Sequence, residues 1–219
     1  MNKIIRSGLL LSIFAVSIPS HALINLGFAK WEIGPFLRAG NLKDLNSRSG
    51  LDPTWSRYYG LGISNHFHFS DLMLSADLSL SRKKIRYASE NVSTRSSFDL
   101  TLQEIELPVL IWNVHDLELM ALRYGAGVSF LRGQGKVKSH TAVTNKGNNV
   151  LVSSSSNQTY TEAQLKQNYL GLSAGFGVDF NLLLIKMATD VRYTYVPNRG
   201  TGGSNTNYHA VELMLGVLL

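Results

Sequence analysis

The sequence contains no cysteine, so every function that depends on a thiol is excluded. The chain can form no disulfide, no thiolate zinc site, no cysteine nucleophile and no lipoprotein anchor. Charged residues are also scarce, at 16% of 219 residues against the roughly 25% of ordinary soluble domains. Apolar residues make up 44% of the chain, and only 5 residues are proline. This composition predicts a folded domain and argues against disorder.

Long runs of positive charge are missing too, although the formal net charge is +6. The longest uninterrupted run of lysine and arginine is Arg82-Lys83-Lys84. A protein that follows a nucleic-acid backbone needs a more extended basic patch or stripe. We therefore expect no nucleic-acid partner.

No segment after residue 22 is long and apolar enough to cross a bilayer as a helix, which takes about 20 residues. Before that point, Lys3 and Arg6 precede an apolar stretch at residues 8–16, and Ser20-His21-Ala22 forms a small-x-small cleavage site. These are the three parts of a secretory signal peptide. The sequence thus predicts a signal peptide at 1–22 and one mature domain at 23–219, which can enter a membrane only as strands.

From Trp31 onward, apolar side chains recur at every second position, the period of a β-strand. The pattern predicts eight strands, at residues 31–39, 55–69, 72–81, 98–111, 120–130, 170–180, 187–195 and 210–219. The connections alternate between long polar segments and short turns. The long segments are residues 41–54, 82–97, 133–162 and 198–207, and we expect each of them to be a loop.

One face of each expected strand is apolar, while the other carries mainly glycine, serine and charged residues. Apolar residues facing lipid and polar residues facing the interior are typical of a membrane barrel, which also leaves no strand edge unpaired. The sequence therefore predicts an all-β fold, an eight-stranded antiparallel up-and-down transmembrane β-barrel in the outer membrane. A soluble eight-stranded barrel is the structural alternative, because the alternation of apolar and polar residues alone does not say which face is exposed to water.

Two details of the pattern give further expectations. Apolar residues stand at even positions up to Leu102 and at odd positions from Ile105 onward, and this change predicts a β-bulge near Gln103 and Glu104. Aromatic residues cluster near the strand ends, as two interfacial girdles would require. The girdle beside the short turns would hold Phe67, Phe69 and Trp112, and the other would hold Trp55, Tyr58, Tyr59, Tyr193 and Tyr195.

Three stretches carry a resemblance to a known family. Glu106-Leu107-Pro108-Val109-Leu110 is similar to the Glu-Ile-Pro-Leu-Leu type of strand in PorT-type outer-membrane β-barrel proteins of Bacteroidota. Tyr124-Gly125-Ala126-Gly127 resembles the Gly-Ala-Gly strand of that family, and residues 175–180 with 190–195 resemble one of its late hairpins. The resemblance implies residence in the outer membrane and a link to protein secretion, and it implies no catalytic residues.

Nine charged residues fall on the faces expected to point inward. Eight strands enclose too little space for an open pore, so these side chains should fill the lumen as a hydrogen-bonded ionic network. A narrow conducting path is the alternative. The nine residues are Glu32, Arg38, Asp77, Glu106, Arg123, Asp179, Asp190, Arg192 and Glu212.

Histidines are the remaining candidates for chemistry. His66 and His68 share one face of a strand and could place two imidazoles on one metal ion, with His115 as a possible third ligand. His209 lies on the lipid-facing parity, where a lipid-modifying barrel enzyme would carry a catalytic histidine. No serine and acid partners are identifiable for it.

We therefore expect a non-enzymatic outer-membrane barrel with no catalytic, cofactor-binding or metal-binding residues. Its role would be structural or secretion-associated, with long extracellular loops as the partner surface. The expected partners are outer-membrane lipid and lipopolysaccharide and, through the resemblance, components of protein secretion. Two alternatives stay open: a lipid-modifying outer-membrane enzyme and a narrow porin-like channel.

Overall fold

The computed structural model describes residues 24–25, 30–46, 50–182, 185–200 and 207–219. The expected signal peptide at 1–22 lies outside these ranges. Within them no helix is long and apolar enough to cross a bilayer. The strands are β1 (Ile24–Asn25), β2 (Lys30–Asp44), β3 (Asp52–Thr54), β4 (Ser56–Phe69), β5 (Leu72–Ala76), β6 (Leu78–Glu90), β7 (Thr94–Leu117), β8 (Met120–Asn145), β9 (Leu151–Gln158), β10 (Asn168–Leu182), β11 (Ile185–Val196) and β12 (Tyr208–Leu218).

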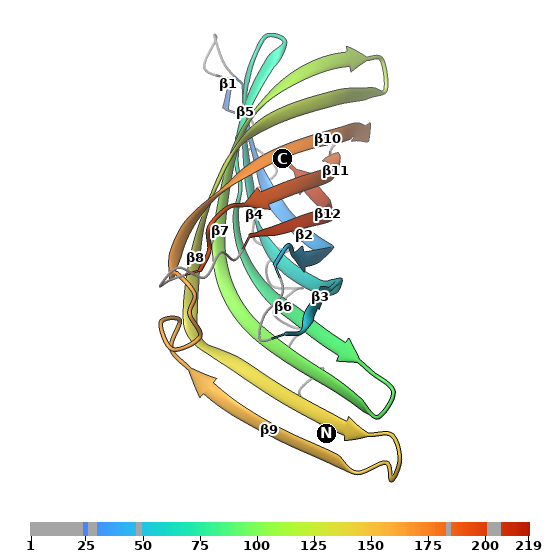
Figure 1. Cartoon of the computed structure of the whole chain (residues 1–219). Coiled ribbons are helices and arrows are strands. Elements are labelled where there is room, and N and C mark those ends of the chain that lie inside the picture. Colours follow the sequence, from blue (N-terminus) through green and yellow to red (C-terminus); the bar gives the residue numbers. More distant parts are fainter. Residues whose placement is uncertain (1–23, 26–29, 47–49, 183–184, 201–206) are drawn as a thin grey trace, which may run out of the picture.

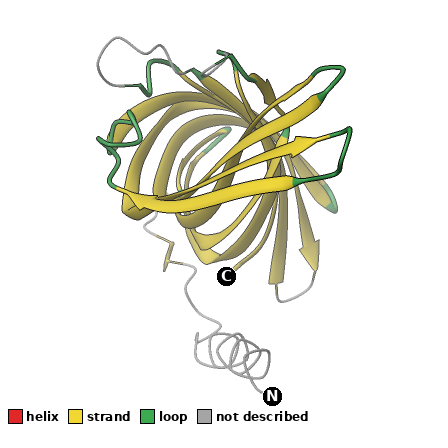
Figure 2. Ribbon diagram, turned by 60° about the horizontal axis from the view of Figure 1, so that its bottom comes forward, coloured by secondary structure: helices red, strands yellow, loops and turns green. Residues whose placement is uncertain are grey.

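The sheet closes on itself into a barrel of eight strands, as the sequence predicted (Figures 1 and 2). The ring runs through β2, β4, the β5–β6 pair, β7, β8, β10, β11 and β12. It closes because β2 pairs with β12 on one side and with β4 on the other. All of these pairings are antiparallel, so neighbouring strands run up and down around the barrel.

The β5–β6 pair is one continuous strand with a single interruption at Asp77. Its register against β7 is the same before and after that residue, with Ala76 opposite Val109 and Ser79 opposite Glu106. The Asp77 amide donates to the Pro108 carbonyl at 3.1 Å. Pro108 has no N–H to return the bond, so the ladder misses one rung there.

Burial alternates along the barrel strands, with the polar face inside and the apolar face outside. On β2 the side chains of Glu32, Arg38 and Asp44 are buried, while Leu37 and Ala39 between them are exposed. Apolar side chains are 50 to 62% exposed all round the ring, at Leu37, Leu61, Leu80, Ile111, Leu170 and Leu215. An apolar exterior around a charged interior is the arrangement of a membrane barrel, and the soluble alternative is excluded.

A belt of exposed polar side chains borders the apolar exterior on one side. Its members lie side by side in pairs on neighbouring strands, because the register pairs Asn41 with Arg57, Arg82 with Gln103, and Arg132 with Asn168. We call these six residues the polar belt. The short turns that follow β4 and β7, and the paired ends of β10 and β11 at Leu182 and Ile185, lie at the other end of the barrel, which we call the short-turn end.

Beyond the polar belt the chain continues as strands, and two of the expected loops are wrong. Residues 82–97 form the ends of β6 and β7, which are joined only by residues 91–93. Most of 133–162 is a hairpin of β8 and β9, and both hairpins project past the ring (Figure 1). Only a few side chains of these segments, such as Ile85, Tyr87 and Val137, reach the apolar cluster at the barrel mouth, and most of the others are polar, so the sequences read as loop.

The expected bulge is on the wrong strand. The register between β7 and β8 shifts between Thr101 and Gln103, but the extra residues belong to β8, where Gly135 has a positive φ of 66°. The register of β7 against β6 is unbroken through the same region. Leu102 is simply inside the barrel, because the interior changes from charged to apolar at that level.

Candidate functional site

Two clusters of buried charges fill the lumen. In the first, Arg123 bonds to Asp179 at 2.8 Å and to Asp190 at 2.6 Å. Arg192 bonds to Asp77 at 2.5 Å and to Asp190 at 2.9 Å. None of these side chains is more than 4% exposed. Asp190 therefore links two arginines, and each arginine holds a further aspartate from another strand.

An indole ring lies against this first cluster. The guanidinium groups of Arg123 and Arg192 lie 5.2 and 5.4 Å from the ring of Trp112. The Trp112 Nε1–H donates to the Ser75 hydroxyl at 2.8 Å. Trp112 is thus a lumen residue, and its expected place in the interfacial girdle is wrong.

The second cluster lies nearer the polar belt. Arg38 bonds to Glu106 at 3.0 Å and to Glu212 at 2.5 Å. Lys83 bonds to Glu104 at 3.1 Å and to Glu106 at 2.9 Å. Together the two clusters contain eight of the nine charged residues expected inside, and all eight are buried. The ninth, Glu32, is also buried and lies at the short-turn end.

Tyrosines and a further arginine complete the second cluster. The Tyr58 hydroxyl donates to Glu212 at 2.7 Å, so Tyr58 is also a lumen residue and its expected girdle position is wrong. Arg199 and the Tyr169 hydroxyl both bond to Glu104. Arg199 belongs to the segment between β11 and β12, which the sequence predicted only as a loop at 198–207.

The mouth of the barrel above this cluster is closed by the segment between β9 and β10. Tyr160, Ala163 and Leu165 are buried there in an apolar cluster with side chains of the barrel wall. The Tyr160 hydroxyl donates to the Gln103 carbonyl at 2.9 Å. A Cβ at Gly133 would lie 2.1 Å from the Tyr160 ring, so this contact requires glycine at that position.

The two external hairpins carry an excess of positive charge. Arg86 donates two bonds to Asp99, at 2.8 and 3.2 Å, and Lys84 lies 2.6 Å from the same carboxylate. Partial burial raises the pKa of Asp99, but the bonds from Arg86 and Lys84 outweigh it and hold the pKa below its usual value. At the hairpin tips Lys146 lies 2.8 Å from Glu90.

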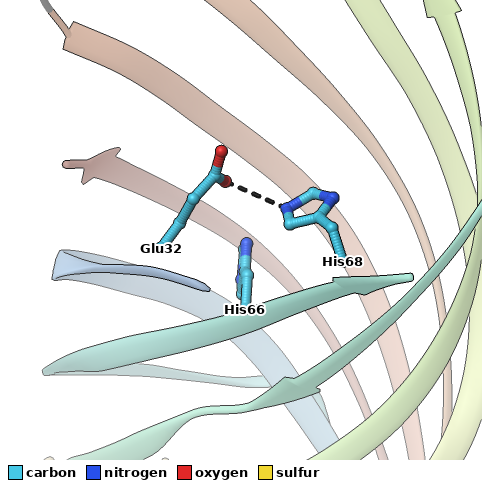
Figure 3. Close-up of side chains that lie close together, drawn as sticks. All are labelled: Glu32, His66 and His68. Atoms are coloured by element: carbon cyan, nitrogen blue, oxygen red, sulfur yellow. Dashed lines mark hydrogen bonds and ion pairs between the residues drawn. The ribbon is translucent and has the colours of Figure 1, made fainter. Parts of the chain in front are cut away.

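The predicted histidine pair comes together with a carboxylate at the short-turn end (Figure 3). Ligand atoms of Glu32, His66 and His68 all lie within 4.8 Å of one another. His115, considered only as a possible third ligand, is not in this group: it lies on the outer surface and stacks on Tyr124 with ring centroids 5.7 Å apart. The sequence left Glu32 out of this group because β2 and β4 meet only in the folded sheet.

His209 lies among aromatic side chains on the outer surface. Its ring stacks on Trp55 at 4.9 Å between centroids and meets the edge of Tyr193 at 6.1 Å. Glu212, the nearest acid along β12, points into the lumen and bonds to Arg38 and Tyr58. These contacts place His209 among the aromatic side chains of the outer surface, as in an interfacial girdle.

A closed ring of eight strands with lipid-facing apolar side chains and a packed ionic lumen defines a transmembrane β-barrel of the outer membrane. The chain is similar in structure to neisserial surface protein A, at 18% identity and a TM-score of 0.43 over 87% of this chain and 97% of that one. It is similar to the attachment invasion locus protein Ail of Yersinia pestis, at 14% identity and a TM-score of 0.37 over 86% and 98%. It is also similar to the N-terminal β-barrel domain of OprF of Pseudomonas aeruginosa, at 12% identity and a TM-score of 0.26 over 83% and 96%.

No family model matches the chain, and no curated protein sequence matches it. The assignment to the outer-membrane barrels therefore rests on the strand ring and on the two faces of its wall. The resemblance to PorT-type barrels, with the link to secretion that it implies, stays a prediction.

Proposed function

We propose that this protein is a non-enzymatic outer-membrane barrel that binds phosphorylated lipopolysaccharide at the cell surface. In this proposal the polar belt and the external hairpins face outward, and the short-turn end faces the periplasm. Long strand extensions on the cell surface and short periplasmic turns are the usual asymmetry of such barrels.

The observation that carries the proposal is the charge of the surface beyond the apolar band. Over residues 82–101 and 132–166, nine exposed or half-buried lysines and arginines face only three acids, Glu90, Asp99 and Glu162. The acids Glu90 and Asp99 are already paired within the hairpins. The nine cations are Arg82, Lys84, Arg86, Arg95, Arg132, Lys136, Lys138, Lys146 and Lys166. Lipid phosphates and acidic core sugars would neutralise the excess.

The polar belt supports the same ligand. Arg57, Arg82 and Arg132 lie where the apolar exterior ends, which is the level of lipid headgroups. A groove of about 800 Å³ runs below Arg82 and is lined by Leu37, Ala39, Leu61 and Leu213. An acyl chain in this groove would place its headgroup beside the Arg82 guanidinium.

The packed ionic lumen and the aromatic surroundings of His209 favour binding over catalysis. A nucleophile needs a base within about 2.6 to 3.2 Å and a third group that orients the base. A conducting path is also disfavoured, because paired side chains cross the lumen at two levels and Tyr160 closes its mouth. The proposed work of the protein is therefore done by its outer surface.

Calorimetry with soluble ligand tests the proposal. The barrel is refolded into zwitterionic vesicles and titrated with delipidated core oligosaccharide, either phosphorylated or treated with phosphatase. We expect saturable binding of the phosphorylated form that weakens as salt is added, because screening acts on exposed charges. The phosphatase-treated form should bind at least tenfold more weakly.

Two charge variants make the test specific. Neutralising Arg95, Lys136 and Lys138 to glutamine should weaken binding, while neutralising Glu90 and Glu162 should leave it equal or stronger. Equal binding of the two oligosaccharides, or no loss on neutralising the three cations, would contradict the proposal.

A further inference from the structure

A second site lies at the short-turn end of the lumen, away from the hairpins. Glu32 on β2 lies directly opposite His66 on β4 in the register of these strands, and His68 follows two residues later on the same face. The His68 Nε2 is 3.0 Å from Glu32 Oε2. Two imidazoles and a carboxylate therefore converge from two neighbouring strands (Figure 3).

His66 is an independent sign that the group is incomplete. Its side chain is 2% exposed, and neither ring nitrogen has a hydrogen-bond partner among the residues that the structure describes. The Asp77 Oδ1 lies 3.7 Å from Nε2, which is too far for a hydrogen bond. Buried polar atoms normally have hydrogen-bond partners. An unpartnered buried imidazole beside two other ligating groups therefore indicates that a cation binds there.

We propose that Glu32, His66 and His68 bind one divalent transition-metal ion of the Zn²⁺ type. Two imidazole nitrogens and one carboxylate oxygen suit Zn²⁺, Ni²⁺ and Cu²⁺, whereas Ca²⁺ and Mg²⁺ prefer sets made only of oxygen. The fourth position on the ion is left to water, because the His68 side chain is 14% exposed at the lumen end.

Two lysines compete with the ion for Glu32. Lys30 Nζ lies 2.6 Å from Glu32 Oε1, and Lys186 Nζ lies 2.9 Å from Oε2. Lys30 is 45% exposed and can move into solvent, while Lys186 keeps its bond to Asp179 at 2.9 Å. The ion can therefore enter without stranding a buried ammonium group, although the competition lowers its affinity.

Copper spectroscopy on the untagged, refolded barrel tests the site. Cu²⁺ is added to one equivalent, and the electron paramagnetic resonance spectrum should show coupling to two nitrogens. Cu²⁺ binds such ligands more tightly than Zn²⁺, so Zn²⁺ in large molar excess should be needed to remove this signal, and Ca²⁺ at the same excess should not remove it. Calorimetry with Zn²⁺ alone should give one ion per chain.

Variants connect the signal to the three residues. His66→Gln and His68→Gln should each weaken Zn²⁺ binding at least tenfold and remove one nitrogen from the copper spectrum, and Glu32→Gln should weaken binding with both nitrogens retained. His115→Gln, on the outer surface, is the matched control and should change neither measurement. Heat-modifiable migration in gels confirms that each variant folds, and the more exposed His68 carries the test if His66→Gln does not.

The proposal fails if no Zn²⁺ binds at millimolar concentration. It also fails if the folded His68→Gln variant binds Zn²⁺ as the parent does, or if Ca²⁺ competes equally. Lipopolysaccharide binding involves the opposite end of the barrel, so neither result bears on the other proposal.

Discussion

Removing the positive charge of Arg192 tests the ionic lumen most severely. Arg192 is 1% exposed and bonds to Asp77 at 2.5 Å and to Asp190 at 2.9 Å. In Arg192→Met, Asp190 keeps Arg123 at 2.6 Å, whereas among the described residues the ion pair left to Asp77 is the one with His66, at 3.7 Å. Breaking a buried ion pair and leaving one charge uncompensated costs about 3 to 5 kcal/mol. We expect a loss of this size in the free energy of unfolding.

The assay is urea unfolding of the barrel in phosphatidylcholine vesicles, followed by tryptophan fluorescence. Trp112 lies 5.4 Å from the Arg192 guanidinium, so its emission should also change in the folded variant. The double variant Asp77→Asn with Arg192→Met removes both charges and should be more stable than Arg192→Met alone. Arg95→Met, on an exposed hairpin, is the control and should stay within about 0.5 kcal/mol of the parent.

The reasoning is refuted if Arg192→Met unfolds within about 1 kcal/mol of the parent, a value well below the loss of a buried pair. It is equally refuted if the double variant is no more stable than the single one. Either result would mean that water reaches these charges and that the lumen is not packed as described.

Three further predictions concern the two faces, the topology and the absence of chemistry. Leu78→Arg, on the lipid-facing surface, should destabilise the barrel by about 2 to 4 kcal/mol, and Leu78→Ala by much less, in the same urea titration. Protease added to intact cells should cleave at residues 146–150, the tip of the β8–β9 hairpin; cleavage only after the outer membrane is permeabilised would reverse the orientation. Mass spectrometry should find the same lipid A in cells with the parent protein, with His209→Ala and without the protein, and a difference that depends on His209 would make this an enzyme.

The barrel core was predictable because each membrane strand has one lipid face and one lumen face. An outward apolar residue is followed by an inward polar one, as at Leu37 and Arg38 or at Leu80 and Ser81, whichever strand lies next to it. The same rule placed nine charged residues inside. Their partners could not be predicted, because pairs such as Arg38 with Glu212 join residues far apart in the chain.

The expectation of an apolar outer face and a polar inner face was wrong where apolar side chains line the lumen. Leu100 and Leu102 are inside the barrel beneath the closed mouth, although apolar parity had placed the apolar face outside. Reading that change as a bulge also separated Glu104 from Glu106, which lie on the same face and both bond to Lys83. The interior above the second cluster is apolar because Tyr160 and its neighbours exclude water.

The β6–β7 and β8–β9 hairpins beyond the membrane were not predicted for a different reason. Ser153 to Ser156 form part of β9 and pair with residues 139–142 of β8 through backbone hydrogen bonds, not through a buried face. Backbone pairing leaves no periodic signal in the sequence. The charge of these hairpins was visible in composition, but the side chains that share one surface appear only once β6 to β9 are aligned.

The central claim is that alternate side chains of one strand face lipid and lumen, with water beginning at the polar belt. The chain has no cysteine, so single cysteines can be introduced and spin-labelled at each position from Leu72 to Arg86. Labels at even positions up to Leu80 should be accessible to oxygen and not to a water-soluble nickel complex. At even positions from Arg82 onward the nickel complex should reach the label. Labels at odd positions should be immobile. Nickel access at Leu74 or Leu78, or oxygen access that does not alternate, would contradict the account.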